Sequence, residues 1–89
     1  MDRAPNGYSK RMAIRVLFFG FAADRMKTRE MLLDPEPNLR IDAVFERFQA
    51  TLGAPADRFL FSVNDEWAPA DRLLLDGDTV AFIPPMSGG

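Results

Sequence analysis

The residues that could do chemistry in this sequence lie at its C-terminal end. The last six residues are Pro84-Pro85-Met86-Ser87-Gly88-Gly89, and they follow an apolar run with the composition of a strand. The two prolines fix φ and supply no N–H, so they end a strand and direct the chain away in an extended form. The two glycines have no Cβ and can pass through a narrow channel in a partner. The terminal carboxylate of Gly89 is therefore predicted to be the reactive group.

The segment that carries this carboxylate is predicted to thread into a partner. It consists of Pro84, Pro85, Met86, Ser87 and Gly88, and residues 86–89 are expected to form a flexible functional tail. The alternative is an end that frays and has no role, which is the common fate of chain termini. A frayed end does not need a rigid diproline before it, so the functional interpretation is favoured.

Size and composition exclude most kinds of enzyme. The chain has 89 residues, enough for one small domain with one core and no deep cleft between domains. It contains no cysteine and no histidine. Disulfides, thiolate nucleophiles, imidazole catalysis and the usual zinc sites are all excluded with them. We therefore expect no metal site, and no enzymatic activity of the chain on its own.

Charge and hydropathy limit the classes of partner that the chain could bind. The net charge is −2, and the first 12 residues are basic, so the remaining domain is more acidic than the whole chain. An acidic domain argues against nucleic acid as a partner. No apolar run approaches the ~20 residues of a membrane span, and the N-terminus has no apolar signal region. The sequence predicts a soluble, cytoplasmic protein with a disordered extension at residues 1–12, unless Met12 is the true start.

Two apolar runs at opposite ends of the chain are predicted to be central strands. Residues 14–19 and 79–83 are both rich in β-forming side chains, as expected of strands covered on both faces. Both can be central only if they lie side by side, most simply in parallel, with the rest of the chain as the crossover.

The segments between these runs complete the predicted fold. Residues 21–27 favour a helical turn, residues 29–33 a hairpin strand, and residues 41–52 an amphipathic helix that ends at Gly53 and that Asn38 could cap. Residues 59–63 alternate as a half-buried strand, residues 64–67 turn the chain, and residues 73–75 predict a turn or a short 3₁₀ segment. This order predicts an α+β domain over residues 13–85 with a ubiquitin-like β-grasp. Its mixed sheet would carry one main helix on one face, and the diglycine tail would extend beyond it.

Strand alternation assigns side chains to the two faces of the sheet. Arg15 and Thr79 identify the face without the helix, yet this face also carries apolar side chains near the tail. We predict a docking patch for a partner, formed by Leu17, Phe19, Trp67 and Ile83. The alternative is ordinary surface exposure of single apolar residues, or cover by the crossover loop.

Taken together, these motifs resemble a known family. The resemblance lies in Val63-Asn64 with an acidic-aromatic pair after it, in the Asp76-Gly77-Asp78 turn before the last strand, and in the diproline and the terminal Ser87-Gly88-Gly89. It extends over residues 13–89 and is similar to the small subunit of molybdopterin synthase, in the MoaD/ThiS family of sulfur carriers. Ala23-Asp24 and Lys27 differ from the arginine-glutamate pair and the glycine common in that loop, and Leu75 is more apolar than usual.

The resemblance implies a function for the tail. A partner adenylyltransferase would use ATP to activate the Gly89 carboxylate, and a sulfurtransferase or cysteine desulfurase would supply the sulfur for a thiocarboxylate. The carrier would bind no cofactor itself. Its tail would enter the large subunit, in a heterotetramer of two small and two large subunits, and give sulfur to cyclic pyranopterin monophosphate to form the molybdopterin dithiolene. The alternatives are a carrier for thiamine or cysteine synthesis, a ubiquitin-like modifier joined to lysines through Gly89, and an interaction module with an inert tail.

Overall fold

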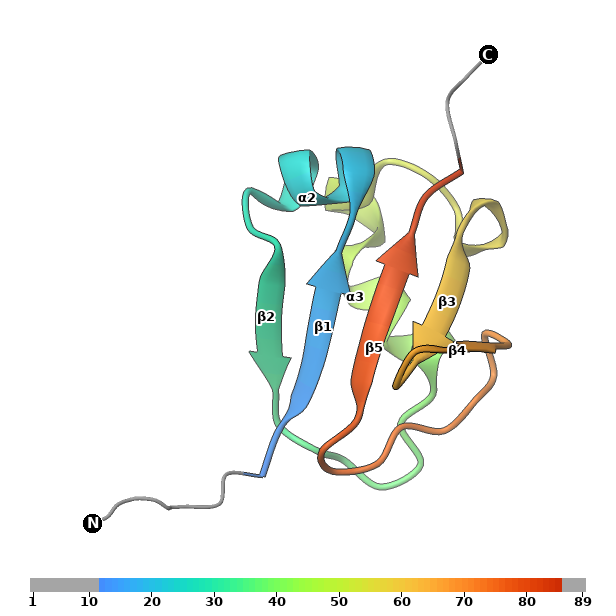
Figure 1. Ribbon diagram of the computed structural model, residues 1–89. Helices are drawn as coiled ribbons and strands as arrows, with labels where there is room; N and C mark the ends of the chain where they lie inside the picture. Colours follow the sequence, from blue (N-terminus) through green and yellow to red (C-terminus); the bar gives the residue numbers. More distant parts are fainter. Residues whose placement is uncertain (1–11, 86–89) are drawn as a thin grey trace, which may run out of the picture.

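The computed structural model of the chain describes residues 12–85 (Figure 1). Of the predicted N-terminal extension, residues 1–11 lie outside this range, and Met12 is exposed. The predicted tail residues Met86, Ser87, Gly88 and Gly89 also lie outside it. The described part includes the whole predicted domain and the diproline.

A five-stranded mixed sheet forms the body of the domain, with the order β2-β1-β5-β3-β4. The strands are β1 (Ile14–Phe18), β2 (Glu30–Leu33), β3 (Leu60–Val63), β4 (Glu66–Ala68) and β5 (Thr79–Ile83). β1 and β5 are parallel neighbours in the centre, and β2 and β3 pair with them in antiparallel fashion. The prediction that the two terminal runs are central and parallel is confirmed, and the α+β, ubiquitin-like β-grasp fold with it.

Two helices connect the strands. The short α2 (Gly20–Met26) follows β1 directly, and the long α3 (Ile41–Leu52) crosses the back of the sheet in Figure 1. α3 ends as predicted, because Gly53 adopts a left-handed conformation with φ 75° and its N–H donates to the Gln49 carbonyl. Among residues 12–85, no helix covers the other face of the sheet. No helix within residues 12–85 is long and apolar enough to cross a membrane.

Two local predictions were wrong. Asn38 does not cap α3: it lies in the preceding turn with φ 58°, and the N-cap position is Arg40, without a side-chain cap. The reason is that Leu39 is buried and Arg40 forms a β-bridge with Leu73, so tertiary pairing sets where the helix begins. That bridge also replaces the turn or 3₁₀ segment predicted at residues 73–75, and the 3₁₀ helix η1 lies at Ala56–Arg58 instead.

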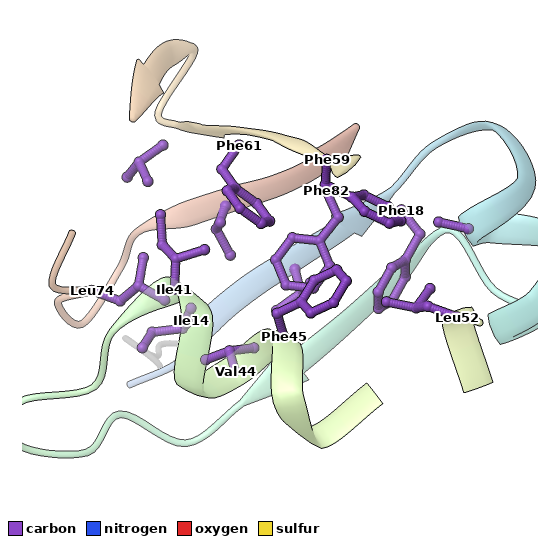
Figure 2. Close-up of a cluster of buried hydrophobic side chains, with 14 of the residues drawn as sticks. Ile14, Phe18, Ile41, Val44, Phe45, Leu52, Phe59, Phe61, Leu74 and Phe82 are labelled. Carbon is purple, nitrogen blue, oxygen red and sulfur yellow. The ribbon is translucent and has the colours of Figure 1, made fainter. Parts of the chain in front are cut away.

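The core lies between α3 and the sheet, and five of its buried residues are phenylalanines that contact one another (Figure 2). The ring of Phe45 on α3 lies 4.9 Å from that of Phe59 and 5.4 Å from that of Phe82, measured between centroids. Phe82 also contacts Phe18 and Phe61 edge to face, at 5.7 and 5.4 Å. These rings bury the helix-facing side of β1, β3 and β5, as strand alternation predicted.

A polar turn fixes the register of the two central strands at the end opposite α2. The N–H of Ala13 donates to Asp76 Oδ1 at 3.0 Å, and the N–H of Gly77 donates to the Ala13 carbonyl at 2.9 Å. Asp78 is buried, and its carboxylate accepts from Asn64 Nδ2 at 2.9 Å and from the N–H of Leu75 at 2.8 Å. The Asp76-Gly77-Asp78 turn therefore ties the start of β5 to the start of β1 and to the β3–β4 hairpin.

Removing the central core ring tests this packing. Phe45→Ala is expected to lower the free energy of unfolding by about 3–5 kcal/mol, because a buried aromatic side chain would leave a cavity. Leu60→Ala is the matched control, since Leu60 is 58% exposed and its loss should change the free energy by no more than about 0.5 kcal/mol. Urea denaturation followed by circular dichroism measures both. Equal losses in the two variants would contradict the assignment of the core.

Candidate functional site

The tail leaves the domain at a defined corner of the sheet. β1 and β5 point the same way, so the end of β5 lies beside the start of α2 (Figure 1). The N–H of Phe19 donates to the Phe82 carbonyl at 3.3 Å, which continues the pairing just past the end of β1. Pro84 is half-buried and Pro85 exposed. The segment that carries Gly89 therefore begins at a fixed point, on the edge shared by α2 and the open face of the sheet.

The open face carries a hollow of about 310 Å³ next to this point. All four residues predicted to form a docking patch line this hollow: Leu17, Phe19, Trp67 and Ile83. Phe19 is 47% exposed and Trp67 71% exposed. The rest of the lining is Ser62, Asp65, Thr79 and Ala81.

Strand register explains why the sheet is hollow here. Leu17 pairs with Ala81, Ala81 with Ser62, and Ser62 with Trp67, so these four side chains form one row across β1, β5, β3 and β4. The two inner members of the row are small and the two outer members are large. The result is a floor of two small side chains between raised walls, which could receive a side chain of a partner.

The β3–β4 hairpin brings Trp67 into this row. Asn64 and Asp65 both have positive φ, 53° and 71°, between the paired residues Val63 and Glu66. Two such residues form the type I′ turn that matches the twist of a two-stranded hairpin. Trp67 is thus in strand β4, two residues beyond Asp65, and it lines the hollow. The prediction that Trp67 lies in the turn itself was wrong.

The predicted docking patch did not include Leu60 or Ala81. Leu60 is directly opposite Ile83 and is 58% exposed, so it enlarges the apolar surface beside the hollow. Strand alternation gave a signal for both residues, because Leu60 alternates with the buried Phe59 and Phe61, and Ala81 with the buried Val80 and Phe82. We call Leu17, Phe19, Leu60, Trp67, Ala81 and Ile83 the open-face patch.

A second hollow, of about 690 Å³, lies at the end of β1, against α2 and the loop that follows α2. Its lining includes the charged residues Asp24, Lys27 and Arg29, so it contains part of the loop that differs from the family pattern. Leu17 and Phe19 line both hollows. Phe19 therefore belongs to both the charged hollow and the open-face patch, at the corner where the tail begins.

The open-face hollow has few polar groups. They are the hydroxyls of Ser62 and Thr79 and the carboxylate of Asp65. Within residues 12–85, no three carboxylates lie close enough together to hold a metal ion. An exposed, mainly apolar hollow of this kind can receive part of a protein surface.

Comparison with known proteins gives one family match and several structural likenesses. The model of the ThiS family matches residues 16–89, which is most of the chain and includes the terminal diglycine. SAMP1 (small archaeal modifier protein 1) from Haloferax volcanii superposes with a TM-score of 0.71 at 19% identity, covering 86% of this chain and 99% of that one.

Two further solved structures share the fold. Urm1 from Trypanosoma brucei gives a TM-score of 0.65 at 24% identity, with 91% of this chain and 99% of that chain covered. A chain of the complex between subunits 1 and 2 of the Helicobacter pylori molybdopterin-converting factor gives 0.59 at 23% identity, with 88% and 100% covered. At these identities the likenesses show the fold alone.

The two faces of the sheet should respond oppositely to a new charge. Phe19→Asp is expected to leave the domain folded, because Phe19 is half-exposed and its new carboxylate would stay in water. Val80→Asp is expected to unfold it, because Val80 is fully buried and an unpaired buried charge costs several kcal/mol of the roughly 5–15 available. Circular dichroism and thermal unfolding measure both. An unfolded Phe19→Asp beside a folded Val80→Asp would invert our assignment of the faces.

Proposed function

The chain belongs to the ThiS family of small β-grasp sulfur carriers, and from this we propose that it is the sulfur-carrying small subunit of a molybdopterin synthase. Membership of this family establishes a broader class than the proposal, namely a ThiS/MoaD-type sulfur carrier or ubiquitin-like modifier. The observation that carries the sulfur-carrier part of the proposal is that the family match extends to Gly89, so it includes the diglycine that follows β5. The molybdopterin branch rests on the residues before that diglycine.

The proposed reaction takes place at the carboxyl group of Gly89. A carboxylate is a poor acyl donor, so a partner adenylyltransferase first joins it to the AMP part of ATP and releases pyrophosphate. The terminal sulfur of a persulfide on a sulfurtransferase or cysteine desulfurase then displaces AMP and forms an acyl disulfide. A thiol reductant supplies two electrons, cleaves the S–S bond and leaves the thiocarboxylate on Gly89. This chain supplies the acyl group and the threading segment, and it needs neither a cofactor nor a cysteine. The acid-base residues belong to the partners.

The sequence around the tail favours the molybdopterin branch. The chain carries Ile83-Pro84-Pro85 and Ser87 before the diglycine, with the Asp76-Gly77-Asp78 turn one strand earlier. Carriers for thiamine or cysteine synthesis share the fold and the diglycine, but this approach to the tail is more similar to the molybdopterin carriers. The final acceptor would be cyclic pyranopterin monophosphate, held by the large subunit.

We assign the open-face patch as the surface that docks on the large subunit. Its side chains surround the corner from which the tail leaves, so a partner bound there would lie next to the tail. Its exposed aromatic residues are of the type enriched at the centres of interfaces. The Helicobacter pylori protein of the same fold was solved in a complex with subunit 2 of its converting factor. A heterotetramer of two small and two large subunits is the assembly expected here.

A ubiquitin-like modifier is the second candidate. In that case the activated Gly89 would form isopeptide bonds with lysines of other proteins. The shared fold of small archaeal modifier protein 1 favours this candidate, but a fold shared at 19% identity does not specify chemistry. The fate of the activated tail distinguishes the two candidates.

Changing the last residue of the chain tests the carrier function. Deleting Gly89, or adding one residue after it, is expected to abolish thiocarboxylate formation, because the reacting carbon would be lost or displaced. The unfolding midpoint should not change, since residues beyond the last strand contribute little burial. Intact mass spectrometry, after incubation with ATP, the adenylyltransferase and a sulfur source, measures the exchange of one oxygen for sulfur.

The outcomes separate the hypotheses. A thiocarboxylate on the wild-type chain that transfers sulfur to cyclic pyranopterin monophosphate supports the proposal. A ladder of conjugates on other proteins supports the modifier instead. Full activity in the Gly89 deletion would show that the tail is not the donor.

Docking at the open-face patch has its own test. Phe19→Asp or Ile83→Asp is expected to weaken binding to the large subunit by at least about a hundredfold, because an unpaired charge in a dry interface costs several kcal/mol and about 1.4 kcal/mol is tenfold. Gln49→Asp is the matched control, since it places the same charge on the exposed side of α3. Isothermal titration calorimetry measures the three affinities. Wild-type binding by Phe19→Asp would exclude this patch from the interface.

A further inference from the structure

Gly20 lies unusually close to the first residue of the departing tail segment. A Cβ built on Gly20 would be 3.0 Å from Cγ and 3.8 Å from Cδ of Pro84, and 3.0 Å is tighter than nearly all real contacts of a Cβ. Gly20 also has φ +54°, in the left-handed region that favours glycine. The first turn of α2 and the proline ring therefore touch only because residue 20 has no side chain.

The surroundings of this contact are fixed on both sides. β1 passes into α2 through Phe19 alone, and Phe19 is hydrogen-bonded to Phe82 on β5. The far end of α2 is tied to α3, because Arg25 Nη1 donates to the Leu52 carbonyl at 2.7 Å. Within α2, the Arg25 guanidinium also lies 5.0 Å from the centre of the Phe21 ring. α2 therefore cannot easily move away from Pro84.

We infer that Gly20 is a positioning residue for the tail: it lets Pro84 rest on the first turn of α2, and this contact sets the direction in which the chain leaves the sheet. The inference rests on the proposed function, because the direction matters only if a partner must receive Gly89. It assigns Gly20 no contact with substrate and no part in the chemistry.

A change in the direction of the chain at Pro84 would displace the reacting end. Gly89 is only four residues beyond Pro85, and misplacement of a reacting group by about 1 Å can cost about a hundredfold in rate. Docking through the open-face patch would be unaffected.

Four variants test the contact. Gly20→Ala inserts the methyl group against Pro84. Gly77→Ala is the matched control, because Gly77 also has positive φ, +91°, but a Cβ there meets nothing within 4 Å and the site is at the far end of β5. Pro84→Ala removes the ring, and the double variant combines the two changes at the contact. All four should keep the circular dichroism spectrum of the wild type.

The measurement is the steady-state rate of thiocarboxylate formation on the full chain, with ATP, the adenylyltransferase and a sulfur source. Gly20→Ala is expected to lower kcat by roughly tenfold or more, with KM for the carrier within about twofold. Gly77→Ala should stay within about twofold in both. In a chain that already carries Pro84→Ala, adding Gly20→Ala should lower kcat by no more than Gly77→Ala lowers it in the wild-type chain. A purely structural role would not produce this split between kcat and KM or this dependence on Pro84.

Each other outcome is decisive. If Gly20→Ala lowers kcat equally with and without the Pro84 ring, the effect is due to backbone strain and the inference is overturned. A wild-type kcat in the Gly20→Ala variant would also overturn it. If Gly20→Ala does not fold, Pro84→Ala carries the test, because it breaks the contact without changing α2, and an unchanged kcat there would overturn the inference. A wild-type chain that forms no thiocarboxylate would instead overturn the proposed function, and this inference with it.

Discussion

The parallel pairing of β1 and β5 is the constraint on which the rest of the structure depends. Because the two strands come from opposite ends of the domain, everything between them must act as a crossover, and α3 takes that place on one face. Because they are parallel, β1 ends where β5 ends. The start of α2 and the root of the tail therefore share one corner, while the Asp76-Gly77-Asp78 turn holds the other ends in register through its bonds to Ala13. A slip of one residue would exchange the buried and open faces of β5 and would displace the tail from that corner.

β5 serves the core and the open face at the same time. Val80 and Phe82 are fully buried against the helix side, whereas Ala81 and Ile83 face the hollow. The small size of Ala81 and Ser62 is what makes the row between Leu17 and Trp67 concave, so the shape of the open-face patch depends on residues that contribute little contact area themselves. A larger side chain at position 81 would fill the floor without any loss in the core. Stability and shape are thus determined by alternate residues of one strand.

The sequence could predict those features that repeat along the chain or end an element. Two-residue alternation assigned the faces of β1 and β5, three- and four-residue spacing located α3, and Gly53 marked its end. The start of α3 could not be predicted from Asn38, because the bridge between Arg40 and Leu73 joins residues far apart in sequence. The sequence allowed four apolar residues to be grouped on one face, namely Leu17, Phe19, Trp67 and Ile83. The hollow that they line could not be predicted without the register of the strands. The contact of Gly20 with Pro84 leaves no local signal at all, since a glycine after a strand is equally typical of any turn.

A carrier without cysteine or histidine has two tasks, to bind a partner and to deliver its C-terminus, and this fold gives them to different residues. The open-face patch offers apolar area, which affects how tightly a partner holds the domain but not where Gly89 goes. The contact between Gly20 and Pro84 offers almost no area, yet it determines the angle at which the tail starts. Phe19 joins the two, because it lines both hollows and its N–H pairs with β5 one step before the tail. A partner bound on the patch would therefore contact, at Phe19, the residue whose backbone pairs with β5 just before the tail segment begins. Binding energy gained on the face could in this way be used to orient a reacting group remote from it, which is what a transfer reaction needs.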